Sequence, residues 1–187
     1  DVATVELIDA MHKSTNQLNE TLNELIKVLI IKENTNKQLS SISFAETLEQ
    51  VQQSIHAIIE KSECVIISDF KEAPTVNFDK TYLESILLNL ITNAIKYAHP
   101  NRNPVIYITS TKSNAGIQLN VSDNGIGFNM AKVKGKIFGL YQRFHNHPDS
   151  KGFGLYLIHA QVTSLGGTIH VNSIENEGTR FLINFKD

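Results

Sequence analysis

Four short stretches of amide, carboxylate and glycine residues have the types and the order needed for one nucleotide pocket. They are Asn89-Leu90-Ile91-Thr92-Asn93-Ala94, Asp123-Asn124-Gly125-Ile126-Gly127, Gly152-Phe153-Gly154-Leu155 and Gly178-Thr179. An Asn can ligate Mg²⁺ and an Asp can recognise adenine, so the set predicts an ATP site. Each stretch alone is weak evidence, and the prediction depends on finding all four in one small domain.

The first stretch places two amides on one face of a predicted helix. Asn89 and Asn93 are four residues apart in a strongly apolar segment, so both side chains project from the same face. A neutral amide oxygen suits Mg²⁺ when phosphates supply most of the negative charge. The alternative is a pair of amides bonded to backbone. Lys96, three residues further on, is either a phosphate ligand or a solvated surface lysine.

The second stretch follows the end of a predicted strand. A carboxylate at Asp123 can accept a hydrogen bond from an exocyclic amine such as that of adenine, and Gly125 and Gly127 let the backbone approach a ligand. The alternative is an ordinary Asp-Asn-Gly turn, a common sequence in loops.

The remaining two stretches lie at the beginnings of elements. Gly152 and Gly154 stand at a predicted helix start, where free N–H groups and the helix dipole favour phosphate, and Leu155 belongs to the same stretch. Gly178-Thr179 opens the last predicted strand, and a simple turn explains it equally well when it is considered alone.

The elements that must position these residues fall into two predicted domains, residues 1–40 and residues 41–187. Residues 2–38 contain neither Gly nor Pro and predict one long helix. A heptad seam runs along it through Ile8, Met11, Thr15, Leu18, Leu22, Leu25 and Leu29. A narrow apolar seam on an otherwise polar helix favours a coiled coil or bundle over packing against the chain's own domain.

Residues 41–187 predict an α+β domain. Expected helices are a segment within 44–61 that follows a short strand, 80–98 capped by Asp79, and 153–165; expected strands are 64–70 (buried), 105–111, 117–121, 168–173 and 179–185. Residues 124–151 are predicted to be an irregular, functional loop. Helices on one face of a mixed sheet make a two-layer α/β sandwich.

Composition excludes several classes of protein. The 187 residues carry a net charge of −2, which gives no indication of a nucleic-acid or anionic-membrane partner. Cys64 is the single cysteine and lies in an apolar run, so we expect a core residue and no internal disulfide. There is no apolar stretch long enough to span a bilayer and no signal peptide. We expect a cytoplasmic piece of a longer protein, which a missing part could anchor to a membrane.

The four stretches resemble the N, G1 and G2 boxes of the catalytic ATP-binding domain of two-component sensor histidine kinases, a branch of the gyrase, MutL and heat-shock chaperone ATPases. Lys136-Ile137-Phe138 to Arg143-Phe144 resembles the F box of the ATP lid. The resemblance covers about residues 40–187 and implies a Bergerat-type ATP-binding fold. One departure is Ser150, where the family often has Gly.

The resemblance also implies a role for each site residue. Asn93 would bind Mg²⁺ and Asp123 would recognise adenine. Asn89, Lys96 and Arg143 would lie near the phosphates and serve catalysis. The pocket and lid would be shaped by Gly125, Gly127, Gly152, Gly154, Leu155 and Thr179. Asn89 stands where the gyrase branch carries a catalytic Glu, which argues against a dedicated ATP hydrolase.

Residues 2–38 resemble the second helix of the dimerisation and histidine-phosphotransfer hairpin. This implies a homodimer through residues 5–31, a phosphoacceptor His on an upstream helix, and a response-regulator receiver domain as partner. None of the seven histidines is followed by an acidic residue, and His12 precedes Lys13. Two alternatives stay open: a nucleotide-dependent interaction module without chemistry, and a serine kinase of the anti-sigma type.

Overall fold

The computed structural model describes residues 38–113, 116–133, 135–139 and 152–186, together with residues 4–5, 7–8, 10–12, 14–15, 18–19, 22, 26, 29 and 31. The chain divides into two compact units, Asp1–Thr35 and Asn36–Asp187. No helix among these residues is both long and apolar enough to cross a membrane.

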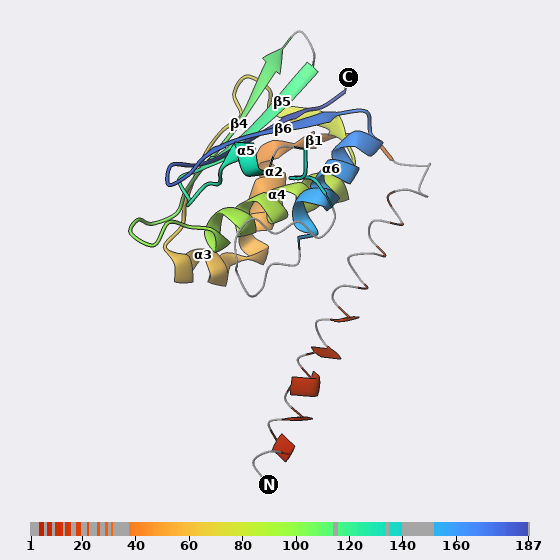
Figure 1. Cartoon of the computed structure of the whole chain (residues 1–187). Helices are drawn as coiled ribbons and strands as arrows, with labels where there is room; N and C mark the ends of the chain where they lie inside the picture. Colours follow the sequence, from red (N-terminus) through yellow and green to blue (C-terminus); the bar gives the residue numbers. More distant parts are fainter. Residues whose placement is uncertain are drawn as a thin grey trace. The chain divides into compact units, whose positions relative to one another are not determined.

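The described residues of the first unit are helical (red in Figure 1). The seam side chains described there are exposed: Ile8 by 48%, Met11 by 62%, Leu18 by 69%, Leu22 by 54% and Leu29 by 55%. Leu25, the remaining apolar member of the predicted seam, lies outside the described residues. These described side chains therefore give this unit an exposed apolar surface.

The second unit alternates strands and helices. In chain order these are β1 (Ser40–Ser43), α2 (Phe44–Ser54), α3 (His56–Ser62), β2 (Val65–Asp69), β3 (Thr75–Phe78), α4 (Lys80–Lys96), β4 (Val105–Ser113), β5 (Gly116–Asp123), α5 (Met130–Val133), α6 (Gly154–Ser164), β6 (Thr168–Ile174) and β7 (Gly178–Asn184).

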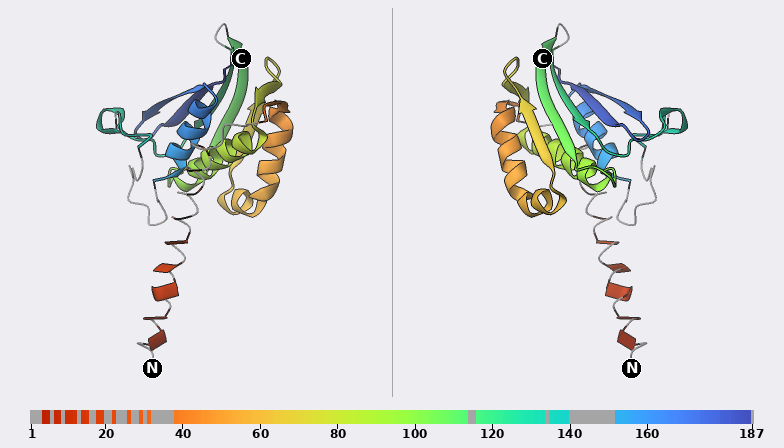
Figure 2. Two further views of the ribbon diagram at one scale, coloured as in Figure 1. Left: turned by 90° about the vertical axis from the view of Figure 1, so that its right-hand side faces the viewer. Right: turned by 90° about the vertical axis from the view of Figure 1, so that its left-hand side faces the viewer.

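The main sheet has five strands in the order β2-β4-β5-β7-β6. The β2–β4 pair is parallel and the other pairs are antiparallel, so the sheet is mixed. Helices α2, α4 and α6 lie on one face of it (Figures 1 and 2). Strands β1 and β3 form a separate antiparallel pair. The predicted two-layer α/β sandwich is confirmed.

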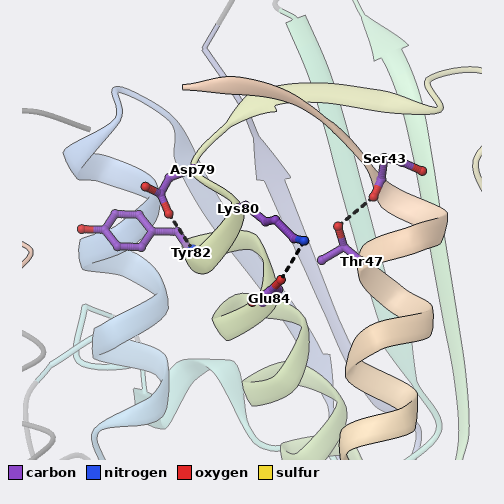
Figure 3. Close-up of polar contacts among 6 residues, drawn as sticks. All are labelled: Ser43, Thr47, Asp79, Lys80, Tyr82 and Glu84. Carbon is purple, nitrogen blue, oxygen red and sulfur yellow. Dashed lines mark hydrogen bonds and ion pairs between the residues drawn. The ribbon is translucent and has the colours of Figure 1, made fainter. Parts of the chain in front are cut away.

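Helix α4 is the central helix of the layer and carries two of the predicted site residues. The Asp79 side chain caps it, because its Oδ1 accepts a hydrogen bond from the Tyr82 N–H at 3.0 Å (Figure 3). Its inward face repeats apolar residues at helical spacing, and these are almost completely buried: Leu83, Ile86, Leu87, Leu90 and Ile91. The helix is therefore anchored at its start and along one face.

A second capped helix packs beside α4. Ser43 caps α2 through its Oγ, which accepts from the Glu46 N–H at 3.3 Å, while the Thr47 hydroxyl donates to the Ser43 carbonyl (Figure 3). Phe44 in its first turn contacts the rings of Phe70 and Phe185. This aromatic cluster joins the helix layer to the last residues of the sheet.

Three details of the predicted element pattern were wrong. The strand at 64–70 is β2, an edge strand whose Val65 and Ile67 are exposed by 49% and 46%, because both lie on the face of the sheet opposite the helices, where Tyr107 of the neighbouring β4 is also exposed. Strand β3 was missed, since Pro74 indicated only a breaker there. The expected strand within 44–61 lies earlier, at β1, and the helix that follows is interrupted at Ile55.

Candidate functional site

The predicted amides lie side by side near the start of α6. The Asn89 Nδ2 donates to the Ser85 carbonyl at 2.8 Å, which leaves its Oδ1 directed away from its own backbone. A Cβ placed on Gly154 would lie 3.0 Å from that Oδ1 and 3.8 Å from the Asn93 Nδ2. A larger residue at Gly154 would crowd the Asn89 Oδ1, so glycine favours this close approach of α6 to Asn89, and α4 packs against α6.

Asp123 ends β5 on the face that the helices cover, because it pairs in register with the buried Ile106. Its Oδ1 accepts hydrogen bonds from the Gly125 N–H at 2.8 Å and the Thr179 N–H at 3.3 Å. Within the described part of the chain, no residue donates a hydrogen bond to its Oδ2. One carboxylate oxygen is thus held by backbone and the other is available to a ligand.

Burial has the largest effect on the pKa of this carboxylate. It raises the pKa of Asp123 above the usual aspartate range, because the charged form loses water. The two backbone N–H bonds, from Gly125 and Thr179, and the nearby Arg102 charge lower the pKa and oppose part of that rise. Carboxylates with a perturbed pKa are typical of binding sites as well as of structural networks.

The loop after Asp123 passes tightly between α4 and the β6–β7 turn. The Ile126 N–H donates to the Tyr97 carbonyl at 2.9 Å, and the Asn176 N–H donates to the Ile126 carbonyl at 2.7 Å. A Cβ on Gly125 would lie 2.5 Å from the Tyr97 carbonyl oxygen. Gly127 has φ +55°, and its Cβ would overlap the Ile174 carbonyl. Both glycines are required by contacts that are distant in sequence.

Three residues organise this loop; Arg102 and Ser173 were not predicted, whereas Asn124 belongs to the second predicted stretch. The Arg102 guanidinium donates to the carbonyls of Asn124, Gly125 and Asn176. The Ser173 hydroxyl accepts from the Phe128 N–H at 2.9 Å and lies 2.9 Å from the Thr179 hydroxyl. The Asn124 side chain accepts from the Val105 N–H at 2.9 Å. No motif marks Arg102 or Ser173, since each bonds main-chain atoms far away in sequence.

The third and fourth predicted stretches lie as expected at the starts of elements. Gly152 has φ +75°, and α6 begins at Gly154 without a side-chain cap from Phe153. Leu155 is the second residue of that helix and is partly buried. Thr179, the second residue of β7, is buried and donates its N–H to Asp123. The stretches are therefore distributed around the C-terminal half of α4.

Of the two predicted cationic site residues, the structure describes Lys96. Lys96 lies in the last turn of α4, with its Nζ 5.8 Å from the centroid of the Tyr97 ring. Arg143 and Ser150 lie outside the described residues. In the F-box segment, Ile137 is buried and the Phe138 ring stacks on His159 of α6 at 5.1 Å. The base of the predicted lid is thus packed against the helix that carries Gly154.

The residues around α4 suit Mg²⁺ only if a ligand brings most of the oxygens. No group of three or more His, Cys, Asp or Glu side chains among the described residues could hold a metal ion. Asn93 is partly buried, and none of the described residues hydrogen-bonds its amide, so its oxygen is a possible single ligand. Mg²⁺ commonly takes one or two protein ligands with phosphate oxygens and water completing its shell.

Together, these contacts define an α/β sandwich in which the predicted amides, glycines and carboxylate lie around the central helix and the end of β5. Residues 78–187 match the family model of the histidine kinase-, DNA gyrase B- and HSP90-like ATPases. The chain belongs to this family, and the domain is of the kind that binds ATP. The resemblance predicted from the four stretches is confirmed.

Two curated relatives are similar over nearly the whole chain. The heme sensor protein HssS of Staphylococcus saprophyticus is 28% identical over 187 residues, which are 100% of this chain and 40% of the relative. The sensor histidine kinase ZraS of Escherichia coli O157:H7 is 30% identical over 182 residues, which are 95% of this chain and 37% of the relative. The chain thus spans well under half the length of these two relatives.

Solved structures share the fold at lower identity. The Acinetobacter baumannii histidine kinase AdeS is similar with a TM-score of 0.75 and 20% identity, covering 96% of this chain and 83% of that one. Histidine kinase ThkA, solved in complex with the response regulator TrrA, is similar with a TM-score of 0.70 and 22% identity, covering 90% and 48%. At these identities the likeness shows the fold.

Proposed function

We propose that this chain is the ATP-binding catalytic part of a sensor histidine kinase, which transfers the γ-phosphoryl group of ATP to a histidine on an upstream helix. The observation that carries the proposal is the arrangement at Asp123. Its Oδ1 is held by two backbone N–H groups, while its Oδ2 receives no hydrogen bond within the described residues. That oxygen can accept the exocyclic amine of adenine.

The phosphates would then extend from Asp123 towards the amides of α4 and the start of α6. Asn93 would ligate Mg²⁺ through its amide oxygen, with Asn89 and Lys96 near the phosphates. Gly152 and Gly154 allow the α6 N-terminus to approach them, where exposed N–H groups and the helix dipole favour negative charge. Arg143 would contribute a further positive charge from the lid.

Asn89 directs the chemistry away from hydrolysis. An amide does not take a proton from water, so this position supplies no general base for activating a water nucleophile. A neutral imidazole needs no such base, because its nitrogen is itself the nucleophile. The chain's residues would therefore bind the nucleotide, orient the phosphates and balance their charge, and the acceptor histidine would supply the bond-forming atom.

The proposed partners follow from the same assignment. A response-regulator receiver domain would accept the phosphoryl group on an Asp, and the fold neighbour ThkA is known in complex with such a regulator. The exposed seam between residues 5 and 31 would form a homodimer. We propose that this reaction takes place in the cytoplasm.

Radiolabelled ATP tests the proposed transfer. The full-length protein is expected to gain a label that acid removes, because phosphohistidine is acid-labile, whereas the 187-residue chain binds nucleotide and gains none. The chain has no His followed by an acidic residue, and positioning of the nucleophile is worth several kcal/mol. Acid-stable label on serine would instead favour a serine kinase, and label on a histidine of this chain would contradict the assignment of the acceptor.

A further inference from the structure

We propose that Arg102 is a positioning residue for adenine recognition, acting through the backbone on which the Asp123 carboxylate depends. The inference rests on the proposed function, since it assigns Asp123 to the base. It concerns a residue outside all four predicted stretches, in the connection between α4 and β4. Arg102 touches no residue of the proposed phosphate site in the described part of the chain.

The contacts of Arg102 bring two separate segments together. Its Nε donates to the Asn124 carbonyl at 2.7 Å, and its Nη2 donates to the carbonyls of Gly125 at 3.1 Å and Asn176 at 2.6 Å. Asn124 and Gly125 follow β5, whereas Asn176 lies in the turn between β6 and β7. One planar guanidinium thus fixes the spacing of the two segments that flank Asp123.

The Gly125 residue transmits this constraint to the carboxylate. Its carbonyl accepts from Arg102, and its N–H donates to the Asp123 Oδ1 at 2.8 Å. The second donor to Oδ1 is the Thr179 N–H, on the strand that follows the Asn176 turn. Both donors that orient the carboxylate are therefore on segments that Arg102 holds. A shift of either would rotate Oδ2 away from the exocyclic amine.

The charge of Arg102 supports adenine recognition by Asp123, as its hydrogen bonds do. It lowers the pKa of Asp123 against the larger effect of burial, so it favours the ionised carboxylate that accepts hydrogen bonds from a ligand. The Arg102 side chain is exposed, and water screens this effect. We therefore assign the main contribution to the three carbonyl contacts. Lysine keeps the charge but presents a compact ammonium group in place of the planar fork.

The test compares two diphosphates that differ at the base. ADP carries the exocyclic amine, and inosine diphosphate has a carbonyl oxygen in its place. Calorimetric affinities of both are measured with Mg²⁺ for the 187-residue chain and for Arg102→Met, Arg102→Lys and Arg180→Met. Arg180 is the matched control, because its Nε bonds the Asn120 side chain on the open face of the sheet. Thermal unfolding reports whether each variant is folded.

We expect Arg102→Met to weaken ADP binding about tenfold, which is roughly the effect of misplacing one hydrogen bond to a charged group. Binding of inosine diphosphate should be unchanged, so the preference for ADP falls by the same factor. Arg102→Lys should lose most of that preference, and Arg180→Met should keep it. This change in preference separates positioning from a general loss of stability, which would weaken both ligands equally.

Every other outcome contradicts either the proposed function or the inference about Arg102. If the unsubstituted chain does not bind ADP, or binds it no better than inosine diphosphate, the proposed function fails at the adenine step. If it prefers ADP and folded Arg102→Met keeps the same preference, or weakens both ligands equally, the inference about Arg102 is wrong and the proposed function stands. Failure of both Arg102 variants to fold would show a structural role and would also overturn the inference.

Discussion

Nucleotide recognition and folding stability favour different protonation states of the Asp123 side chain. Burial raises the pKa of the carboxyl, while the N–H groups of Gly125 and Thr179 and the Arg102 charge partly oppose this. Because the pKa in the folded domain is raised, the folded state binds the proton more tightly than the unfolded chain does. The contribution of Asp123 to the free energy of unfolding is therefore largest at low pH and declines as pH rises through the folded pKa.

Replacing Asp123 by Asn should separate the effect of this residue on nucleotide binding from its effect on stability. An Asn oxygen can still accept from the two backbone N–H groups, so the melting temperature at pH 7 should be equal to or above that of the unsubstituted chain. Adenine nucleotide binding should weaken by roughly 1–3 kcal/mol, the cost of mispairing a buried polar group. The decline of nucleotide affinity as pH falls through the Asp123 pKa should also disappear in this variant.

Calorimetry and thermal unfolding over a range of pH measure both effects. Asp69→Asn is a suitable control, since Asp69 is exposed, accepts a turn N–H from Lys71 and forms an exposed ion pair with the Lys71 Nζ at 3.7 Å. Equal ADP affinity in Asp123→Asn and the unsubstituted chain would remove the adenine assignment.

Asn93 should determine the metal dependence of nucleotide binding. Asn93→Ala removes the proposed amide ligand, so triphosphate affinity should respond less to added Mg²⁺ than it does in the unsubstituted chain. The control is Thr92→Ala on the same helix, because the Thr92 hydroxyl bonds the Leu88 carbonyl within the helix. Titrations of Mg²⁺ at fixed nucleotide concentration measure the difference. Identical titration curves for Asn93→Ala and the unsubstituted chain would refute the ligand role.

Among the elements, α4 carries the largest share of both the core and the site. Its inward face buries Leu83, Ile86, Leu87, Leu90 and Ile91, and its polar positions Asn89 and Asn93 face the start of α6. A helix held by its cap and its apolar face presents the two amides at a fixed separation, which pre-organises them for a ligand. Stability and affinity should therefore respond to different residues of the same helix.

Removal of the α4 cap should reduce stability without altering the site. Asp79→Ala deletes the acceptor for the Tyr82 N–H and is expected to lower the free energy of unfolding by about 1 kcal/mol. Glu84→Gln breaks only a partly exposed ion pair with Lys80 on the same helix, so its effect should be under about 0.5 kcal/mol. Urea unfolding measures both changes. Equal effects of the two variants would contradict the assignment of Asp79 as the cap.

On the scale of the whole molecule, the first unit contributes an exposed seam and the second unit contributes the proposed nucleotide site. Leu18 and Leu22 are exposed by 69% and 54% in the single chain. Burial of such side chains between two copies contributes roughly 25 cal/mol per Å² of apolar area before the cost of association is subtracted. The seam is therefore the proposed origin of the homodimer.

Charges introduced into the seam should prevent that association. Leu18→Glu combined with Leu22→Glu is expected to convert the full-length protein from a dimer to a monomer, as measured by sedimentation velocity. Asn19→Glu adds charge beside the seam without replacing a seam residue, so it should leave the dimer intact. A dimer that persists in the double variant would show that the interface lies elsewhere.

Patterns local in sequence were sufficient to predict much of the fold and the family. Alternating apolar and polar residues predicted most helices and strands, Asp79 predicted the start of α4, and the order of four short stretches predicted the family. These signals are readable because helix caps, heptads and box motifs involve residues only a few positions apart. The seam was predicted in the same way, and its described members are exposed in the single chain.

Contacts between distant segments could be learned only from the folded chain. Arg102 bonds Asn176 across 74 positions, and Gly125 must be glycine because the Tyr97 carbonyl lies against it. The exposure of Val65 and Ile67 in β2 depends on their place on the sheet face opposite the helices, which the apolar sequence does not reveal. Main-chain carbonyls are common to every residue type, so a side chain that binds them leaves no partner motif in the sequence. The positions of these carbonyls are set by the packing of the sheet, the central helix and the turns around the Asp123 carboxylate.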